Sequence, residues 1–203
     1  MSTILFNTAA LQVNEYLLVV NLHEDIYNRI MQIKQNFAEK FDYGLAKKTY
    51  PHITLIHFLL HSMNEDRMVH RIRNIVEMHE PFKVELHGYG SFPAHTIYIN
   101  VFAKHKMVNL VKSIRSLQKW MKPDNEHKPH FILEPHLTVA RKLQAPQYEK
   151  AWIEYEHEPF SAAFMANDLL LLKRKPGEHY STVAKFSLEG KSVSETIQSS
   201  LFT

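Results

Sequence analysis

The sequence predicts an α+β domain, and three observations lead to that fold class. Apolar residues alternate between strand-like runs and helical spacing from about residue 15 to residue 188. These elements repeat loosely on either side of about residue 100, and one short motif occurs once in each half. No change of composition separates the halves, so we expect one domain, or two intimately packed halves, with a substantial core.

The chain begins with residues 1–14, which lack clear periodicity and which we expect to form a loosely held N-terminal arm. The single domain then spans 15–189, and a polar, Ser-rich C-terminal tail covers 190–203. Apolar residues at helical spacing predict helices at about 24–39, 65–78 and 106–121, and a shorter one from Pro146 onward. Apolar and β-branched runs predict strands at about 16–21, 51–58, 82–89, 95–101, 130–141, 163–172 and 180–188.

The repeated motif is Pro-His-apolar-Thr-apolar, at residues 51–55 and again at residues 135–139. In a strand, side chains two apart share a face, so His52 lies beside Thr54 and His136 lies beside Thr138. The bare pattern His-x-Ser/Thr is weak, and a third match at residues 179–181 lacks the proline and the apolar frame. We interpret that third match as a surface pair, and the two full copies as parts of one pocket.

Two imidazoles and two hydroxyls suit the movement of protons around a phosphate. Imidazole has an unperturbed pKa of about 6.5, so one histidine can be neutral while the other is charged. One of His52 and His136 would take a proton from water, and the other would protonate the oxygen that leaves phosphorus. Thr54 and Thr138 would donate hydrogen bonds to the non-bridging oxygens, where negative charge grows.

Composition excludes several other classes of protein. The 203 residues are 45% hydrophobic and 22% charged with a net charge of +3, which is typical of a globular protein and permits a polyanionic partner. The absence of cysteine excludes disulfides and thiolate zinc sites and fits a cytoplasmic location. We expect no signal peptide and no membrane partner, since polar residues interrupt the apolar N-terminus. We also expect no cofactor and no metal, and we interpret His57 and His61 as an incidental pair.

The two motifs resemble the signature motifs of the 2H phosphoesterase superfamily, which includes 2′-5′ RNA ligase-like proteins and cyclic nucleotide phosphodiesterases. The resemblance covers most of residues 15–188, including a strand at 16–20, a Gly-containing hairpin at 84–93 and the strand that follows it. Arg141, three residues after Thr138, matches a common family feature. The first motif departs from the family where it continues through residues 57–60, because many relatives turn there at a glycine.

The resemblance implies an α+β fold with two pseudo-symmetric lobes, each an antiparallel β-sheet with helices outside, around a central cleft. It also implies a metal-independent phosphodiesterase that hydrolyses, or ligates through, 2′,3′-cyclic phosphate or 2′-5′ linkages. His52, Thr54, His136 and Thr138 would be its catalytic residues. The expected partners are RNA ends or nucleotides with a cyclic phosphate, and we expect a monomer.

Contacts to the sugar and base need further residues. Tyr180 could stack a base, or it could be a tyrosine at the edge of the core. Arg141 could bind phosphate, but strict alternation places it opposite to His136 and favours a surface ion pair, unless a bulge or the strand's end re-aims it. The basic residues 173–175 form a turn that is either solvated or close to an RNA backbone.

Two other interpretations remain open at this point. The chain could be a nucleotide- or RNA-binding module that has the same pocket and little catalysis. It could also be an unrelated metal hydrolase that uses several of its 14 histidines. The sequence does not determine the physiological substrate, the direction of the reaction, or which histidine is the acid.

Overall fold

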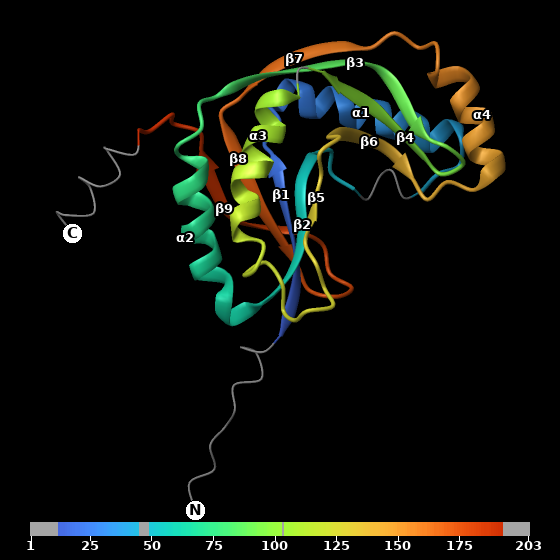
Figure 1. Ribbon diagram of the computed structural model, residues 1–203. Coiled ribbons are helices and arrows are strands. Elements are labelled where there is room, and N and C mark those ends of the chain that lie inside the picture. The colour runs from blue at the N-terminus through green and yellow to red at the C-terminus, as the bar shows by residue number, and fades with distance from the viewer. Residues whose placement is uncertain (1–11, 45–48, 103, 193–203) are drawn as a thin grey trace, which may run out of the picture.

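A curved antiparallel sheet runs through the molecule (Figure 1). The structure, a computed structural model, describes residues 12–44, 49–102 and 104–192. The described strands follow the order β7-β3-β4-β6-β2-β1-β8-β9, and β5 pairs with β2. Their bounds are β1 Val13–Val20, β2 Ile53–His61, β3 Phe82–Phe92, β4 Thr96–Phe102, β5 His130–Phe131, β6 His136–Arg141, β7 Ser161–Ala166, β8 Asp168–Arg174 and β9 Ser181–Ser187.

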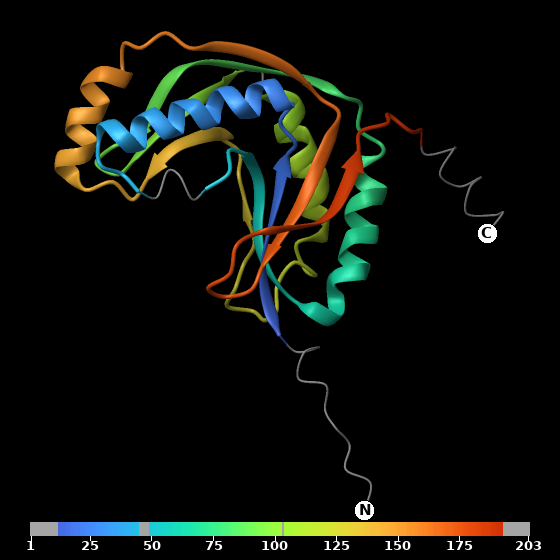
Figure 2. The same ribbon diagram turned by 180° about the vertical axis from the view of Figure 1, so that it is seen from behind.

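The helices cover the sheet in two pairs. Their bounds are α1 Glu24–Lys40, α2 Glu65–Val76, α3 His105–Ile114 and α4 Ala145–Tyr155, with short 3₁₀ turns η3 Ser62–Asn64 and η4 Arg115–Leu117. Helix α1 packs on β6 and α4 on β4, whereas α3 packs on β2 and α2 on β9 and α3. Figure 2 shows from behind how α1 lies along the part of the sheet that contains β6. This arrangement confirms the predicted α+β class with an antiparallel sheet and outer helices.

The two predicted lobes are the two halves of this one sheet, β7-β3-β4-β6 and β2-β1-β8-β9. They meet where β2 and β6 pair, and a single residue pair, Ile53 with Leu137, joins those two strands. Both side chains are fully buried. The central residues of the two motifs therefore form the seam of the molecule, and the rest of each motif strand is free to diverge from the other.

Both motif strands carry a β-bulge immediately after the threonine. In β2 the pairing with β1 shifts by one residue. Between Leu18 and Val19 of β1, strand β2 has one extra residue, Leu55, next to Ile56. In β6 the pairing with β4 shifts in the same way at residues 139 and 140. In each strand two consecutive residues are consequently buried, and the face of every later side chain is reversed. His57 and Arg141 thereby return to the motif face.

Some element bounds differ from the prediction. The apolar run predicted as one strand at 163–172 is two strands, because β7 pairs with β3 in one half of the sheet and β8 pairs with β1 in the other. At the break between them, the Asn167 carbonyl accepts a hydrogen bond from the Leu188 amide at 2.8 Å. The run predicted at 130–141 also divides, into β5 and β6. Strand β1 begins at Val13, inside the predicted arm, while 1–11 and 193–203 lie outside the described residues.

The helices of the described ranges are amphipathic or short. None of them has the length and apolar character that a membrane span requires.

Substitution of Ile53 by Ala tests the seam. Ile53 is fully buried at the only pair between β2 and β6 among the described residues. The lost contacts and the cavity should lower the free energy of unfolding by about 2–5 kcal/mol in a urea titration. The control is Ile153→Ala on the surface of α4, where the side chain is 72% exposed and a change within about 0.5 kcal/mol is expected. Equal effects of the two substitutions would contradict a structural role for the seam.

Candidate active site

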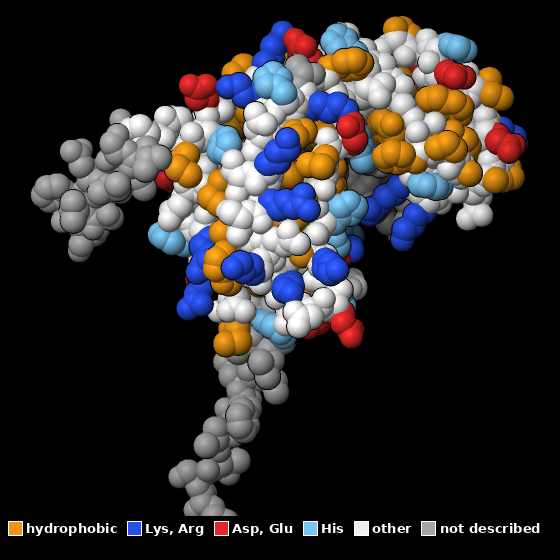
Figure 3. Space-filling model, viewed as in Figure 1, with side chains coloured by type: hydrophobic (Ala, Val, Ile, Leu, Met, Phe, Trp, Pro, Cys, Tyr) orange, Lys and Arg blue, Asp and Glu red, His pale blue; other side chains and the backbone are white. Residues whose placement is uncertain are grey.

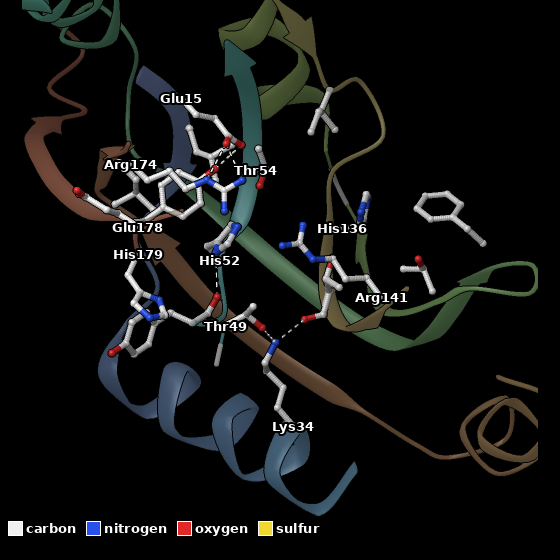
Figure 4. Close-up of a pocket in the computed structure, with 18 residues that line it drawn as sticks. Glu15, Lys34, Thr49, His52, Thr54, His136, Arg141, Arg174, Glu178 and His179 are labelled. Atoms are coloured by element: carbon white, nitrogen blue, oxygen red, sulfur yellow. Dashed lines mark hydrogen bonds and ion pairs between the residues drawn. The ribbon is translucent and has the colours of Figure 1, made fainter. Parts of the chain in front are cut away.

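A cavity of about 520 Å³ opens where the two halves of the sheet diverge, and both motifs line it (Figure 4). It contains all six residues that the sequence singled out for catalysis or substrate binding: His52, Thr54, His136, Thr138, Arg141 and Tyr180. The two motif histidines are half-buried, so both imidazoles are accessible from the cavity. Segments far apart in the sequence thus provide one set of proton carriers and hydroxyls.

The two motif histidines have the same hydrogen-bonded geometry. Nδ1 of His52 lies 2.9 Å from the Tyr50 carbonyl oxygen, and Nδ1 of His136 lies 3.0 Å from the Glu134 carbonyl oxygen. A carbonyl oxygen only accepts, so Nδ1 is the protonated nitrogen in each ring. Nε2 is then the nitrogen that can take up or release a proton. In both copies the acceptor is the residue two positions before the histidine, so the backbone of each motif orients its own imidazole.

The register of the seam sets the motifs opposite each other. With Ile53 beside Leu137 in an antiparallel pair, His52 lies across from Thr138, and Thr54 lies across from His136. Each imidazole therefore has one hydroxyl beside it on its own strand and another on the facing strand. This alternation brings two hydroxyls and two imidazoles to the lining of one cavity.

Lys34 of α1 forms part of the cavity floor (Figure 4). The residue is 2% exposed, and its Nζ donates to Thr49 Oγ1 at 2.9 Å and to the Thr138 carbonyl at 3.5 Å. Burial, with a smaller contribution from the Arg141 cation, lowers the pKa of Lys34 to about 8. Lys34 is therefore mostly charged at pH 7, and among the described residues no carboxylate lies within 4 Å of it.

The two imidazoles have different surroundings. Burial is the main cause that lowers the pKa of His52, and the cations Lys34 and Arg141 add to it, although the Tyr50 hydrogen bond opposes the shift. His52 is therefore biased toward its neutral form. His136 instead lies among aromatic rings, with centroids 5.1 Å from Phe92 and 4.9 Å from Tyr98. The two histidines therefore differ in their neighbours, which are cations for His52 and aromatic rings for His136.

The interpretation of Arg141 as a surface ion pair does not hold. The bulge in β6 places Arg141 on the same face as His136 and Thr138, and the residue lines the cavity. No carboxylate in the described part of the chain lies within 4 Å of its guanidinium. Figure 4 shows the side chain extending from β6 toward His52. Strict alternation failed here because one extra residue in the strand reverses every side chain that follows it.

At the other end of the cavity, Glu15 of β1 organises a network of side chains. Its carboxylate accepts a hydrogen bond from the Tyr180 hydroxyl at 2.6 Å and forms an ion pair with Arg174 at 2.5 Å. Nε2 of His57 lies 3.0 Å from the same carboxylate. Burial alone would raise the pKa of Glu15, but hydrogen bonds from Tyr180 and Arg174 and the Arg174 charge outweigh it and keep that pKa below its usual value.

Tyr180 is held firmly by this network. The Arg174 guanidinium lies over its ring at 4.7 Å from the centroid, while burial and the Glu15 hydrogen bond raise the pKa of its hydroxyl.

Of the basic residues 173–175, Lys173 is paired with Glu65 and Arg174 with Glu15, and Lys175 is exposed. The first two are therefore fixed in β8 instead of forming a solvated turn.

Four features of the site were not predicted from the sequence. They are the places of Lys34, Glu15 and Arg174 in the cavity, and the contact of His57 with Glu15. A signal for Lys34 is present, since it lies four residues after Ile30 and three before Phe37, on the apolar face of its helix. A signal for His57 is also present, because both motifs continue to a basic residue three positions after the threonine. Glu15 and Arg174 carry no local signal, because only the sheet brings β1 and β8 together.

Within the described ranges, no three His, Cys, Asp or Glu side chains come together as a metal site would require. His57 instead contacts Glu15 across the β1–β2 pair.

Comparisons with known structures agree with this fold. The fold matches the crystal structure of apo Escherichia coli LigT with a TM-score of 0.64, at 14% identity over 87% of this chain and 98% of LigT. It matches E. coli LigT complexed with 3′-AMP with a TM-score of 0.60, at 13% identity over 87% of this chain and 99% of that one. It also matches TT0787 of Thermus thermophilus with a TM-score of 0.57, at 18% identity over 88% and 100% of the two chains.

Sequence comparison gives two results. No curated protein sequence matches the chain significantly. The model of the 2′-5′ RNA ligase superfamily matches residues 22–178, a range that contains both histidine motifs, Lys34 and Arg141. Because this match covers most of the sequence, the chain belongs to the 2′-5′ RNA ligase superfamily of 2H phosphoesterases.

Proposed function

We propose that this protein is a phosphodiesterase that opens 2′,3′-cyclic phosphates, or cleaves or forms 2′-5′ linkages, on RNA ends or nucleotides. The observation that carries the proposal is the pair of imidazoles in one cavity, each with Nδ1 bound to a backbone carbonyl. Two nitrogen atoms that can exchange protons then face the same space. Membership of a superfamily of phosphoesterases and RNA ligases supports an enzymatic role.

In the proposed hydrolysis, His52 is the base and His136 is the acid. Neutral His52 accepts a proton at Nε2 from a water molecule as its oxygen bonds to phosphorus. The bond from phosphorus to one ribose oxygen breaks, and that oxygen takes the proton from Nε2 of His136. We base this assignment on the lowered pKa of His52, which burial causes mainly and Lys34 and Arg141 increase, because it favours the neutral form that a base requires. When a ribose hydroxyl replaces water, the same two groups join RNA ends.

The phosphate would be held by hydroxyls and cations from both motifs. Thr54 and Thr138 donate to the non-bridging oxygens as their charge grows. Lys34 and Arg141 supply two positive charges that no nearby carboxylate neutralises within the described part of the cavity. A phosphate anion would also supply a negative charge beside the buried Lys34 ammonium, whose desolvation no nearby carboxylate in the described structure offsets.

The remainder of the cavity suits a nucleoside. Tyr180 lies at its far end with its hydroxyl fixed by Glu15, so its ring is a rigid candidate for stacking a base. The comparison structures of E. coli LigT include complexes with 3′-AMP, ATP and NADP+. A cavity of about 520 Å³ lies in the range usual for ligands of this size.

The first test is the loss of both imidazoles in turn. His52→Ala or His136→Ala should lower kcat for 2′,3′-cyclic AMP by roughly 10²- to 10⁴-fold, because each removes one proton transfer. Phosphorus NMR in the presence of EDTA follows the reaction and identifies the product. His157→Ala, at an exposed histidine outside the cavity, is the control and should leave turnover unchanged. Nucleotide binding without turnover by the wild type would favour a binding module, and a need for metal would point to a metal hydrolase.

The second test concerns the hydroxyl donors. Thr54→Val and Thr138→Val keep the shape of the side chain but remove its donor to the growing charge on phosphate. Each change should lower kcat by about 10²- to 10³-fold with little effect on KM, as measured by steady-state kinetics. An increase of KM at unchanged kcat would show instead that the hydroxyls bind substrate and transition state equally.

The third test uses the pH dependence of kcat/KM, which reports the free enzyme. Since His52 must be neutral to act as base and its pKa is lowered, the acidic limb of the wild-type profile should lie below about pH 6.5. Lys34→Met removes a cation near His52, so this limb should move to higher pH. KM should also rise, by roughly tenfold, through the loss of a charge near phosphate. Lys40→Met, on the exposed part of the same helix, is the control and should move neither quantity.

A further inference from the structure

A second cavity, of about 180 Å³, lies between α2 and the segment that follows η4. Its lining includes four cations, Arg67 and Arg71 from α2 and Lys119 and Lys122 from the segment after η4, and its described lining includes no carboxylate. It shares no lining residue with the first cavity. The proposed active site therefore does not account for it.

The cations continue beyond the cavity as a row that runs from the end of α3 through η4 into the turn after it. Lys112, Arg115, Lys119 and Lys122 follow one another at steps of three or four residues, and residues 105–122 contain no Asp or Glu. Figure 3 shows Lys and Arg side chains gathered over α2 and α3. We call Arg67, Arg71 and these four residues the basic stripe. Within the described part of the chain, none of its six members forms an ion pair.

Such a stripe is electrostatically unfavourable by itself. Like charges three or four positions apart on a helix repel each other and lower its stability. Two other lysines close to α3 do have acidic partners, because Lys104 contacts Glu134 and Lys106 contacts Glu80. A row of unpaired positive charges is compensated when an anion with regularly spaced charges lies along it.

Trp120 gives the stripe a flat apolar surface among its charges. The Arg71 guanidinium lies over the indole ring at 4.0 Å from the centroid, and the Lys119 ammonium lies at 6.0 Å. Trp120 nevertheless remains 42% exposed. A stacked guanidinium keeps its N–H donors in its own plane, where they can bind phosphate. Cations interleaved with an exposed aromatic ring are typical of surfaces that bind single-stranded nucleic acid.

We propose that the basic stripe, with Trp120, is a second nucleic-acid site that binds the backbone phosphates of a single strand outside the catalytic cavity. The spacing of the cations favours a polyanion over an isolated phosphate, and the exposed indole favours unpaired bases over a duplex. This assignment is independent of the chemistry in the first cavity, so the two proposals can be tested separately.

The test measures binding of a fluorescent single-stranded RNA of about 15 nucleotides with a free 3′-hydroxyl, by anisotropy at several salt concentrations. Arg67→Ala/Lys119→Ala should raise Kd about tenfold and reduce the slope of log Kd against log salt by about 1.4, twice the value for one phosphate of a single strand. Trp120→Ala should weaken binding about tenfold by loss of stacking, with the slope unchanged. Hydrolysis of 2′,3′-cyclic AMP by these variants should match the wild type, so a failure of the catalytic proposal is recognised separately.

The matched control is Lys40→Ala/Lys150→Ala, which removes the same net charge from exposed positions on α1 and α4. It should leave both Kd and the salt slope at wild-type values. Equal weakening by the control pair and the stripe pair would overturn the proposal, since net charge alone would then explain binding. The absence of RNA binding by the wild type would also overturn it, as would stripe-dependent binding to phosphatidylserine vesicles without binding to RNA.

Discussion

The single pair between Ile53 and Leu137 is the constraint on which the rest of the structure depends. It joins the two halves of the sheet at the centre of the two motifs and sets their register. On one side β5 continues the pairing with β2, but among the described residues β2 and β6 form no second pair, and a cavity remains that the side chains of both motifs line. A longer ladder between β2 and β6 would bring the strands together and fill that space, whereas no pairing would let the halves move apart. Lys34 of α1 bonds to residues beside both motifs and so reinforces the same seam.

The charges of the cavity are distributed unevenly, and this asymmetry distinguishes two motifs that are otherwise alike. At one end the Glu15 carboxylate neutralises Arg174 and fixes Tyr180. Near the seam, Lys34 and Arg141 have no carboxylate within 4 Å in the described structure, and burial together with these two cations lowers the pKa of His52. Burial of an unpaired ammonium costs free energy, which an anionic ligand would recover on binding.

Much of the candidate site could be predicted from the sequence, because a strand places His and Thr of each motif on one face wherever that strand lies. The helices at 24–39 and 65–78 were predicted well for a similar reason, since a helix shows its buried face in the spacing of Ile30, Phe37, Met68 and Ile72. The strand predicted at 163–172 was less accurate. Its continuous apolar composition does not reveal that β7 and β8 belong to different halves of the sheet.

The sequence by itself determined the α+β class, the two motifs and the faces of their side chains, because these depend on the local periodicity of the backbone. Only the tertiary structure decided the roles of Arg141, Lys34, Glu15 and Arg174. The bulges that turn Arg141 toward the cavity form because neighbouring strands pair with unequal numbers of residues, which one strand alone does not specify. Lys34 reaches the cavity floor because α1 packs on β6, more than a hundred residues away in the sequence. Such long-range packing places Lys34 and Arg141 near His52, and this distinguishes its surroundings from those of His136 in a motif of the same pattern.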